Sequence, residues 1–221
     1  MHMPSGIMPD WLLWLCSAVA LLALIVALWR VDYRKLVNLE QGMFIGAAYG
    51  FLTWIYAMSA GVTPGLTVHF LGVMLTVMMF GPWLALLVLA AAQSTATFFM
   101  GFGAIEALGF NIALCAVLPV VVAALIHLFC YYKLPRTFPV YIFQVGIGDL
   151  LCMAAVNMAI TTCLMNYAGY MSDKIIDEFT IVLVVMGGME ATISTMLACL
   201  LIFFLPQSLT TFSDQEYLDG K

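Results

Sequence analysis

Hydrophobic residues fill long stretches of this chain, and only short polar breaks separate them. Stretches long enough to span a membrane cover residues 11–30, 41–60, 83–100, 106–130, 139–166 and 179–204. A helix needs about 20 apolar residues to cross the hydrocarbon core of a bilayer, so each stretch predicts a transmembrane helix. A seventh, shorter stretch covers 67–81, between Pro64-Gly65 and Gly81-Pro82. Proline and glycine at both ends predict a short, broken helix that lines a cavity instead of facing lipid.

The fold class that follows is an all-α, polytopic membrane protein built as a seven-helix transmembrane bundle. We expect one transmembrane domain over residues 1–221, with an N-terminal loop (1–10), a helical bundle (11–204) and a short polar cytoplasmic tail (205–221). Composition agrees, since 65% of the residues are hydrophobic and 9% are charged, whereas about a quarter of a soluble domain is charged. Lipid is therefore the main surrounding partner. The chain has no basic patch, which argues against a nucleic-acid partner.

The positions of the basic residues predict the orientation in the membrane. With seven spans, six of the seven lysines and arginines fall on one side: Arg30, Arg34, Lys35, Lys133, Arg136 and Lys221. Only Lys174 falls opposite. Cytoplasmic loops carry an excess of Lys and Arg. We therefore expect a multi-pass protein of the cell (inner) membrane whose N-terminus is outside and whose C-terminus is cytoplasmic.

The first two residues form a pattern that can bind a metal ion. A histidine at position 2 offers three nitrogens to one ion, namely the amine of Met1, the deprotonated amide of His2 and the His2 imidazole. Nitrogen ligands in a plane suit Cu(II) or Ni(II). The topology places His69 on the same side, directly after the external turn, where it can supply a fourth nitrogen if the N-terminal loop folds into the bundle. An incidental histidine on a loose chain end is the alternative interpretation.

Two carboxylic acids lie deep in the predicted spans. Asp149 and Glu190 each fall about ten residues into a helix, near the membrane midplane, where an unpaired charge costs several kcal/mol. No lysine or arginine lies deep in any span, so the expected partners are amides and hydroxyls. The pair is either an intramembrane relay for protons or cations, or a hydrogen-bonded link between helices.

A stripe of small residues marks the second predicted span. Gly42, Gly46 and Gly50 recur every four residues. Such a stripe lets a neighbouring helix approach closely, and packing within the bundle is its expected use.

Catalytic motifs are not found in the sequence. The chain has no G-x-x-x-x-G-K-[ST], H-E-x-x-H or G-x-S-x-G pattern, which are the patterns of phosphate binding, zinc proteolysis and serine hydrolysis. We therefore expect that the protein is not an enzyme.

Several motifs together resemble the CbiM/NikM family, the metal-binding membrane subunits of cobalt/nickel energy-coupling-factor (ECF) transporters. The opening Met1-His2-Met3-Pro4-Ser5-Gly6-Ile7-Met8-Pro9 is similar to that family's Met-His-Ile-x-x-Gly-Phe-Leu-Pro. Further similarities, in the same order along the chain, are Val68-His69-Phe70-Leu71-Gly72, Phe80-Gly81-Pro82-Trp83, the stretch from Gln93 to Gly109-Phe110-Asn111, and Met189-Glu190-Ala191. The resemblance implies an N-terminal loop inserted into the bundle from outside. It also implies Met1, His2 and His69 as metal ligands, with Asn111 beside them.

The resemblance leaves the energy source and the metal open. The loop around Gly101-Phe102-Gly103 lacks the family's usual acid, and the tail from Phe212 resembles a proteobacterial branch often found without obvious ATPase partners. The first hypothesis is an uptake permease or substrate-binding subunit for Ni(II) or Co(II), with ATPase and transmembrane coupling subunits as partners and Cu(II) not excluded. The alternatives are a stand-alone ion-coupled carrier and a non-transporting assembly or sensory subunit.

Overall fold

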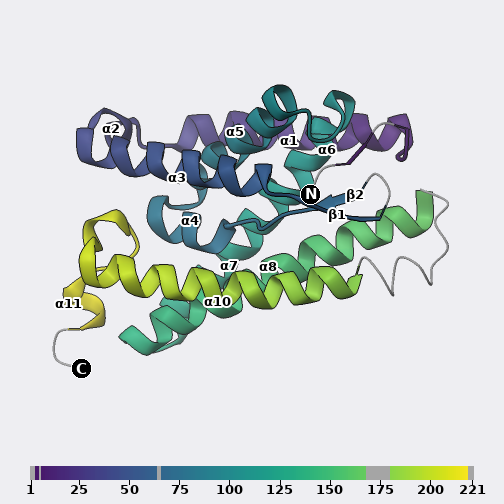
Figure 1. The fold of residues 1–221 in the computed structure, drawn as a ribbon. Helices are drawn as coiled ribbons and strands as arrows, with labels where there is room; N and C mark the ends of the chain where they lie inside the picture. The colour runs from purple at the N-terminus through teal and green to yellow at the C-terminus, as the bar shows by residue number, and fades with distance from the viewer. Residues whose placement is uncertain (1–2, 5, 64–65, 168–179, 219–221) are drawn as a thin grey trace.

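The structure is a computed structural model that describes residues 3–4, 6–63, 66–167 and 180–218. Six longer helices form its frame: α1 (Asp10–Arg30), α3 (Leu39–Ala57), α5 (Pro82–Met100), α7 (Leu118–Lys133), α8 (Phe138–Tyr167) and α10 (Ile181–Phe204). Shorter helices are α2 (Tyr33–Val37), α4 (Val73–Phe80), α6 (Leu108–Ile112) and α11 (Asp214–Tyr217). Figure 1 shows the longer helices lying side by side along one common direction.

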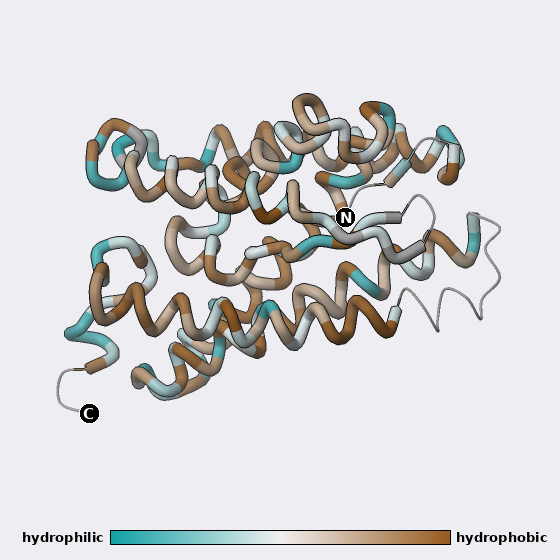
Figure 2. Tube along the Cα trace, in the orientation of Figure 1, coloured by the Kyte–Doolittle hydropathy of each residue, from teal (hydrophilic) through white to brown (hydrophobic). Residues whose placement is uncertain are grey.

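Five helical segments in the described part of the chain are long and apolar enough to cross a membrane, namely Asp10–Arg30, Pro82–Met100, Ile105–Lys133, Phe138–Tyr167 and Ile181–Phe204. The protein is therefore a multi-pass membrane protein. The count of seven spans is not confirmed, because α3 falls outside these five and α4 is far shorter than a span. Figure 2 shows hydrophobic residues along the shafts of the helices and hydrophilic residues mostly at their ends.

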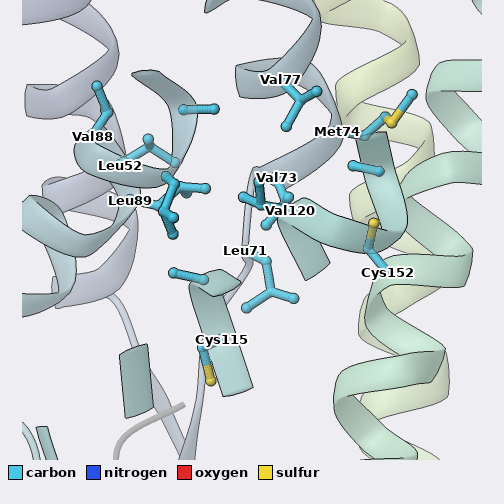
Figure 3. Packing of buried hydrophobic residues seen from close by; sticks show 14 of the residues in the cluster. Leu52, Leu71, Val73, Met74, Val77, Val88, Leu89, Cys115, Val120 and Cys152 are labelled. Carbon is cyan, nitrogen blue, oxygen red and sulfur yellow. The ribbon is translucent and has the colours of Figure 1, made fainter. Parts of the chain in front are cut away.

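Helix α4 lies inside the bundle and is the short, broken helix expected near residues 67–81. Its eight residues span about 12 Å at 1.5 Å per residue, well short of a bilayer core. Gly72 (φ +66°) and Gly81 (φ +78°) bracket it, each in a backbone conformation that L side chains rarely adopt. Helices α5, α7, α8 and α10 all contact it. Figure 3 shows its side chains Val73, Met74 and Val77 within the packed core.

The segment before α4 differs from the prediction. Residues Ala60–Thr63 (β1) and Leu66–Val68 (β2) pair as an antiparallel hairpin, so the chain is not purely helical and α4 begins at Val73 instead of residue 67. Thr67 and Val68 are β-branched, which favours an extended backbone. The left-handed Gly72 then delays the first helical residue.

A second difference lies in the predicted span 106–130. This stretch is a series of linked helical pieces: a 3-10 turn η1 (Ile105–Ala107), α6, a π-helical turn η2 (Ala113–Val117) and α7. Pro119 has no N–H to donate, so regular α-helical bonding cannot continue through it. Turns of π-helix inside α-helices are frequent at functional sites, and this one directly follows α6, which carries Asn111.

The glycine stripe does not have the packing role expected from the sequence. A methyl group added at Gly46 or Gly50 would meet no heavy atom within 4 Å in the described part of the chain. Within that part, α3 is therefore not packed closely through these two residues.

Basic residues gather at one end of the bundle. Arg30 ends α1, Arg34 lies in α2, and both elements are at the end where the C-terminal segment is found (Figure 1). Arg136 reaches the same end, because its guanidinium forms an ion pair with Glu216 at 3.2 Å. Arg30, Arg34 and Arg136 thus lie at the same end of the bundle.

The C-terminal segment, 205–218, packs on the bundle instead of forming a loose polar tail. Thr210 N–H donates to the carbonyl oxygen of Met79 at 3.1 Å, and the Thr211 hydroxyl donates to that of Met78 at 2.8 Å. Both carbonyls belong to the last turn of α4, where no intrahelical donor remains. Buried Phe212 stacks on Tyr217. The short helix η4 (Pro206–Ser208) and α11 lie within this segment.

Candidate metal centre

The N-terminal loop enters the bundle at Met3. Its N–H donates to Oδ1 of Asn111 at 3.1 Å, and its carbonyl accepts from the N–H of Ala104 at 3.0 Å. Met3 and Met8 are both buried, and Gly6 turns the chain with a φ of +75°. The loop then continues into α1 at Asp10, after Pro9. Residues on both sides of Gly6 therefore belong to the hydrophobic core.

Met1 and His2, the two predicted ligands at the start of the chain, lie outside the described residues. What the structure describes is their covalent neighbour, because the N–H that binds Asn111 belongs to the peptide bond that links His2 to Met3.

His69 lies in the loop between β2 and α4 and is 1% exposed. Its Nδ1 lies 2.7 Å from the carbonyl oxygen of Phe70. A carbonyl oxygen only accepts, so Nδ1 carries the proton and the lone pair of the neutral ring is on Nε2. A histidine that binds a metal is commonly oriented by such a hydrogen bond from its other nitrogen.

Tyr56 of α3 holds the same segment from another side. Its ring packs against the His69 ring with the centroids 4.2 Å apart. Its hydroxyl donates to the carbonyl oxygen of Leu71 at 3.0 Å, two residues further along the chain. Tyr56 therefore restrains both the His69 ring and the backbone that follows it. Sequence reasoning missed this residue, because no motif marks a single tyrosine on an apolar helix.

Asn111 lies in α6, just before the π-helical turn η2, and its side chain is buried, with 2% of the residue exposed. Its Oδ1 binds Met3, whereas its Nδ2 has no hydrogen-bond partner among the described residues. The sequence placed Asn111 beside the metal ligands, and the structure places it against the residue that follows His2.

Asp149 and Glu190 meet at the start of α4. Both oxygens of Glu190 accept backbone N–H groups: Oε2 that of Leu71 at 2.9 Å, and Oε1 that of Gly72 at 2.6 Å. Oδ1 of Asp149 accepts the N–H of Met74 at 2.9 Å. Glu190 comes from α10 and Asp149 from α8, so three elements meet at this point.

These partners differ from the expected ones. Amides and hydroxyls were the predicted partners. The hydrogen bonds that the structure describes come instead from backbone N–H groups at and just before the start of α4, which no residue type in the sequence could reveal. Such contacts form the link between helices that the sequence left open, while the relay stays a prediction.

Among the described residues, no group of three His, Cys, Asp or Glu side chains converges on one point. The structure instead combines a buried imidazole at His69, an N-terminal loop anchored through Met3, and two carboxylates that bind the backbone of residues 71–74.

A multi-pass membrane bundle with this buried polar centre defines the class of the molecule. The family model described as the cobalt uptake substrate-specific transmembrane region, CbiM, matches residues 2–208. The chain therefore belongs to the CbiM family. The match includes His2, His69, Asn111, Asp149 and Glu190.

Comparison with solved structures gives the same fold. A structure described as a truncated transition metal transporter is similar with a TM-score of 0.78 and 22% identity, over 92% of this chain and 99% of the other. A second, described as a transition metal transporter, has a TM-score of 0.76 and 22% identity, over 92% and 93% of the two chains. A search among curated proteins finds no match.

Proposed function

We propose that the protein is the substrate-binding membrane subunit of an ECF-type uptake transporter for Ni(II) or Co(II). The ion is captured by four nitrogens: the amine of Met1, the amide and imidazole of His2, and the imidazole of His69. Membership of the CbiM family and the transporter descriptions of its structural neighbours support a transported metal ion as the substrate.

The observation that carries the proposal is the anchoring of Met3. Its N–H and carbonyl are both bound inside the bundle, so the chain is held one peptide bond away from His2. The hydrogen bond from Nδ1 of His69 supports the same function, because it leaves the ring's lone pair on Nε2.

A Ni(II) titration of untagged protein tests the site. We expect His2→Ala and His69→Ala to weaken binding strongly, and an N-terminal tag to abolish it because the tag removes the amine. His127→Ala is the matched control, since His127 lies on α7 outside the proposed site. If both site variants bind as tightly as the parent, the proposed site is wrong.

The intact mass of the purified protein gives a separate check. The chelate needs the amine of Met1, and we expect the mature chain to retain that residue. A chain that lacks Met1 and still binds Ni(II) as tightly would contradict the ligand set.

Metal selectivity follows from the ligand types. Nitrogen ligands accept Ni(II), Co(II) and Cu(II), and copper binds most tightly of these by the general order of affinities. Competition titrations, together with metal analysis of protein from cells, distinguish the ion that the site prefers from the one it carries in the cell.

The orientation of the protein in the membrane can be inferred from the end of the bundle where Arg30, Arg34 and Arg136 lie. We propose that this end faces the cytoplasm and that the N-terminal loop opens to the outside of the inner membrane. Reporter fusions after Lys133 and after Lys221 are expected to report a cytoplasmic location for both. An external signal from either would reverse this topology.

The energy source separates the two transport hypotheses. We propose that ATPase and transmembrane coupling subunits drive uptake, and co-purification with such subunits is the expected result. Partners unrelated to transport would favour an assembly or sensory role instead. A stand-alone carrier is the second candidate, because Asp149 and Glu190 both bind the backbone at the start of α4. It predicts pH-driven metal uptake into proteoliposomes that contain no ATPase.

A further inference from the structure

Helix α4 begins in the interior of a membrane protein, which creates a specific problem for its backbone. The first N–H groups of any helix have no partner within the helix. Water is absent from the bilayer core, so an N–H left unpaired there costs several kcal/mol. Asp149 and Glu190 meet part of this need, because their oxygens accept the N–H groups of Gly72 and Met74 and that of Leu71 just before the helix.

Glu190 makes the more demanding pair of contacts. It binds two consecutive N–H groups, one with each carboxylate oxygen, at 2.9 and 2.6 Å. The left-handed conformation of Gly72 lets neighbouring N–H groups converge on one anion. A carboxylate suits this place, since both of its oxygens accept and the N-terminus of a helix favours negative charge.

The same backbone carries His69. Leu71 is held from both sides, since its N–H binds Glu190 and its carbonyl accepts from the Tyr56 hydroxyl. The Tyr56 ring in turn packs against the His69 ring. A shift of Leu71 would therefore be transmitted to the His69 imidazole within two residues.

We propose that Glu190 is a positioning residue for metal binding, because its carboxylate fixes the backbone of Leu71 and Gly72 and thereby aims the nearby His69 imidazole at the metal ion. This inference rests on the function proposed above. Square-planar coordination is directional, so a site of this kind depends on the residues that hold its ligands. Asp149 contributes less, because it uses a single oxygen on Met74.

The difference between the two acids allows a matched test. Both Glu190→Gln and Asp149→Asn remove one carboxylate. Glutamine keeps one accepting oxygen and turns an NH₂ group toward the second N–H, whereas asparagine can still accept from Met74 through its one oxygen. We expect Glu190→Gln to weaken Ni(II) binding about tenfold or more. Asp149→Asn is expected to stay within about threefold of the parent, since its contact survives.

A double-mutant cycle shows whether Glu190 acts through His69. Untagged protein is titrated with Ni(II) as the parent, Glu190→Gln, His69→Ala and the double variant. We expect the double variant to bind Ni(II) as tightly as His69→Ala alone, because Glu190 acts through His69. We also expect its bound Ni(II) to give the visible spectrum of the His69→Ala variant, a signature that a general loss of stability would not produce.

Other outcomes overturn the inference. If Glu190→Gln lowered the Ni(II) affinity equally in the parent and in His69→Ala, Glu190 would attract the ion by charge alone. The same conclusion would follow if Glu190→Gln and Asp149→Asn lowered the affinity equally. Parent-like binding by Glu190→Gln would exclude any role. A parent protein that binds no Ni(II) would instead refute the proposed function, so the two failures are distinguishable.

A second variant keeps the test available if Glu190→Gln does not fold. Tyr56→Phe retains the ring against His69 and removes only the hydrogen bond to Leu71. We expect it to weaken Ni(II) binding several-fold in the parent and not at all in His69→Ala. The same loss in both backgrounds would contradict the proposal.

Discussion

Replacement of Asn111 by leucine tests whether the N-terminal loop must be docked for the metal ion to bind. Leucine has nearly the size of asparagine and no acceptor, so the change leaves the buried N–H of Met3 without its partner at 3.1 Å. An unpaired buried N–H costs about 1–3 kcal/mol. At about 1.4 kcal/mol per factor of ten, the docked population of the loop falls by roughly 5- to 150-fold relative to the undocked one.

Metal affinity should fall with that population. If only the docked loop completes the site, the apparent dissociation constant rises as the docked fraction falls. Calorimetric titration of untagged protein with Ni(II) measures this change. Hydrogen exchange at residues 3–8 measures undocking directly, and we expect faster exchange there in Asn111→Leu.

Asn111→Asp is the matched control, because it keeps an oxygen that can accept the N–H of Met3. We expect it to bind Ni(II) more tightly than Asn111→Leu. Two results would refute the reasoning: an Asn111→Leu protein within twofold of the parent, or equal losses in the leucine and aspartate variants. Either would mean that the hydrogen bond to Met3 does not control the metal site.

Three further predictions concern α4 and the segment that closes its far end. Gly72→Ala would place a methyl group 2.6 Å from Cδ2 of Leu52 and force alanine into a left-handed conformation. We expect the backbone conformation alone to lower the stability by about 1–2 kcal/mol in thermal unfolding. Adding Leu52→Ala removes the clash, so the double variant should regain only part of the lost stability. Thr211→Val removes the hydroxyl that donates to the Met78 carbonyl at 2.8 Å, and a fall of about 1 kcal/mol in stability is expected, with unchanged stability contradicting the assigned contact. Burial raises the pKa of Tyr217 from 10.0 to about 12. Its neutral form is favoured in the packed segment, so the stabilisation is fully present below pH 10 and is lost as the pH rises through about 12. Absorbance titration of tyrosinate in the parent and in Tyr217→Phe checks this shift, and a parent curve with no late-titrating component would contradict it.

Residues far apart in the chain explain why the candidate site could be predicted only in part. His2, His69 and Asn111 were named from motifs that are local in sequence. The contact that gives Asn111 its place joins residues 108 positions apart, and the contact from Glu190 to Leu71 joins residues 119 positions apart. Such pairs depend on how the helices pack, which hydropathy does not encode.

The sequence by itself determined that this is a helical membrane protein, where most of its long helices run, and which polar residues lie inside it. The physical reason is that a membrane helix satisfies its own backbone hydrogen bonds, so local hydropathy is sufficient to predict it. Tertiary structure alone decided the β-hairpin before α4, the π-helical turn after Asn111 and the use of two buried carboxylates at the start of α4. At the start of α4 the backbone needs partners from α8 and α10, and only the folded bundle supplies them.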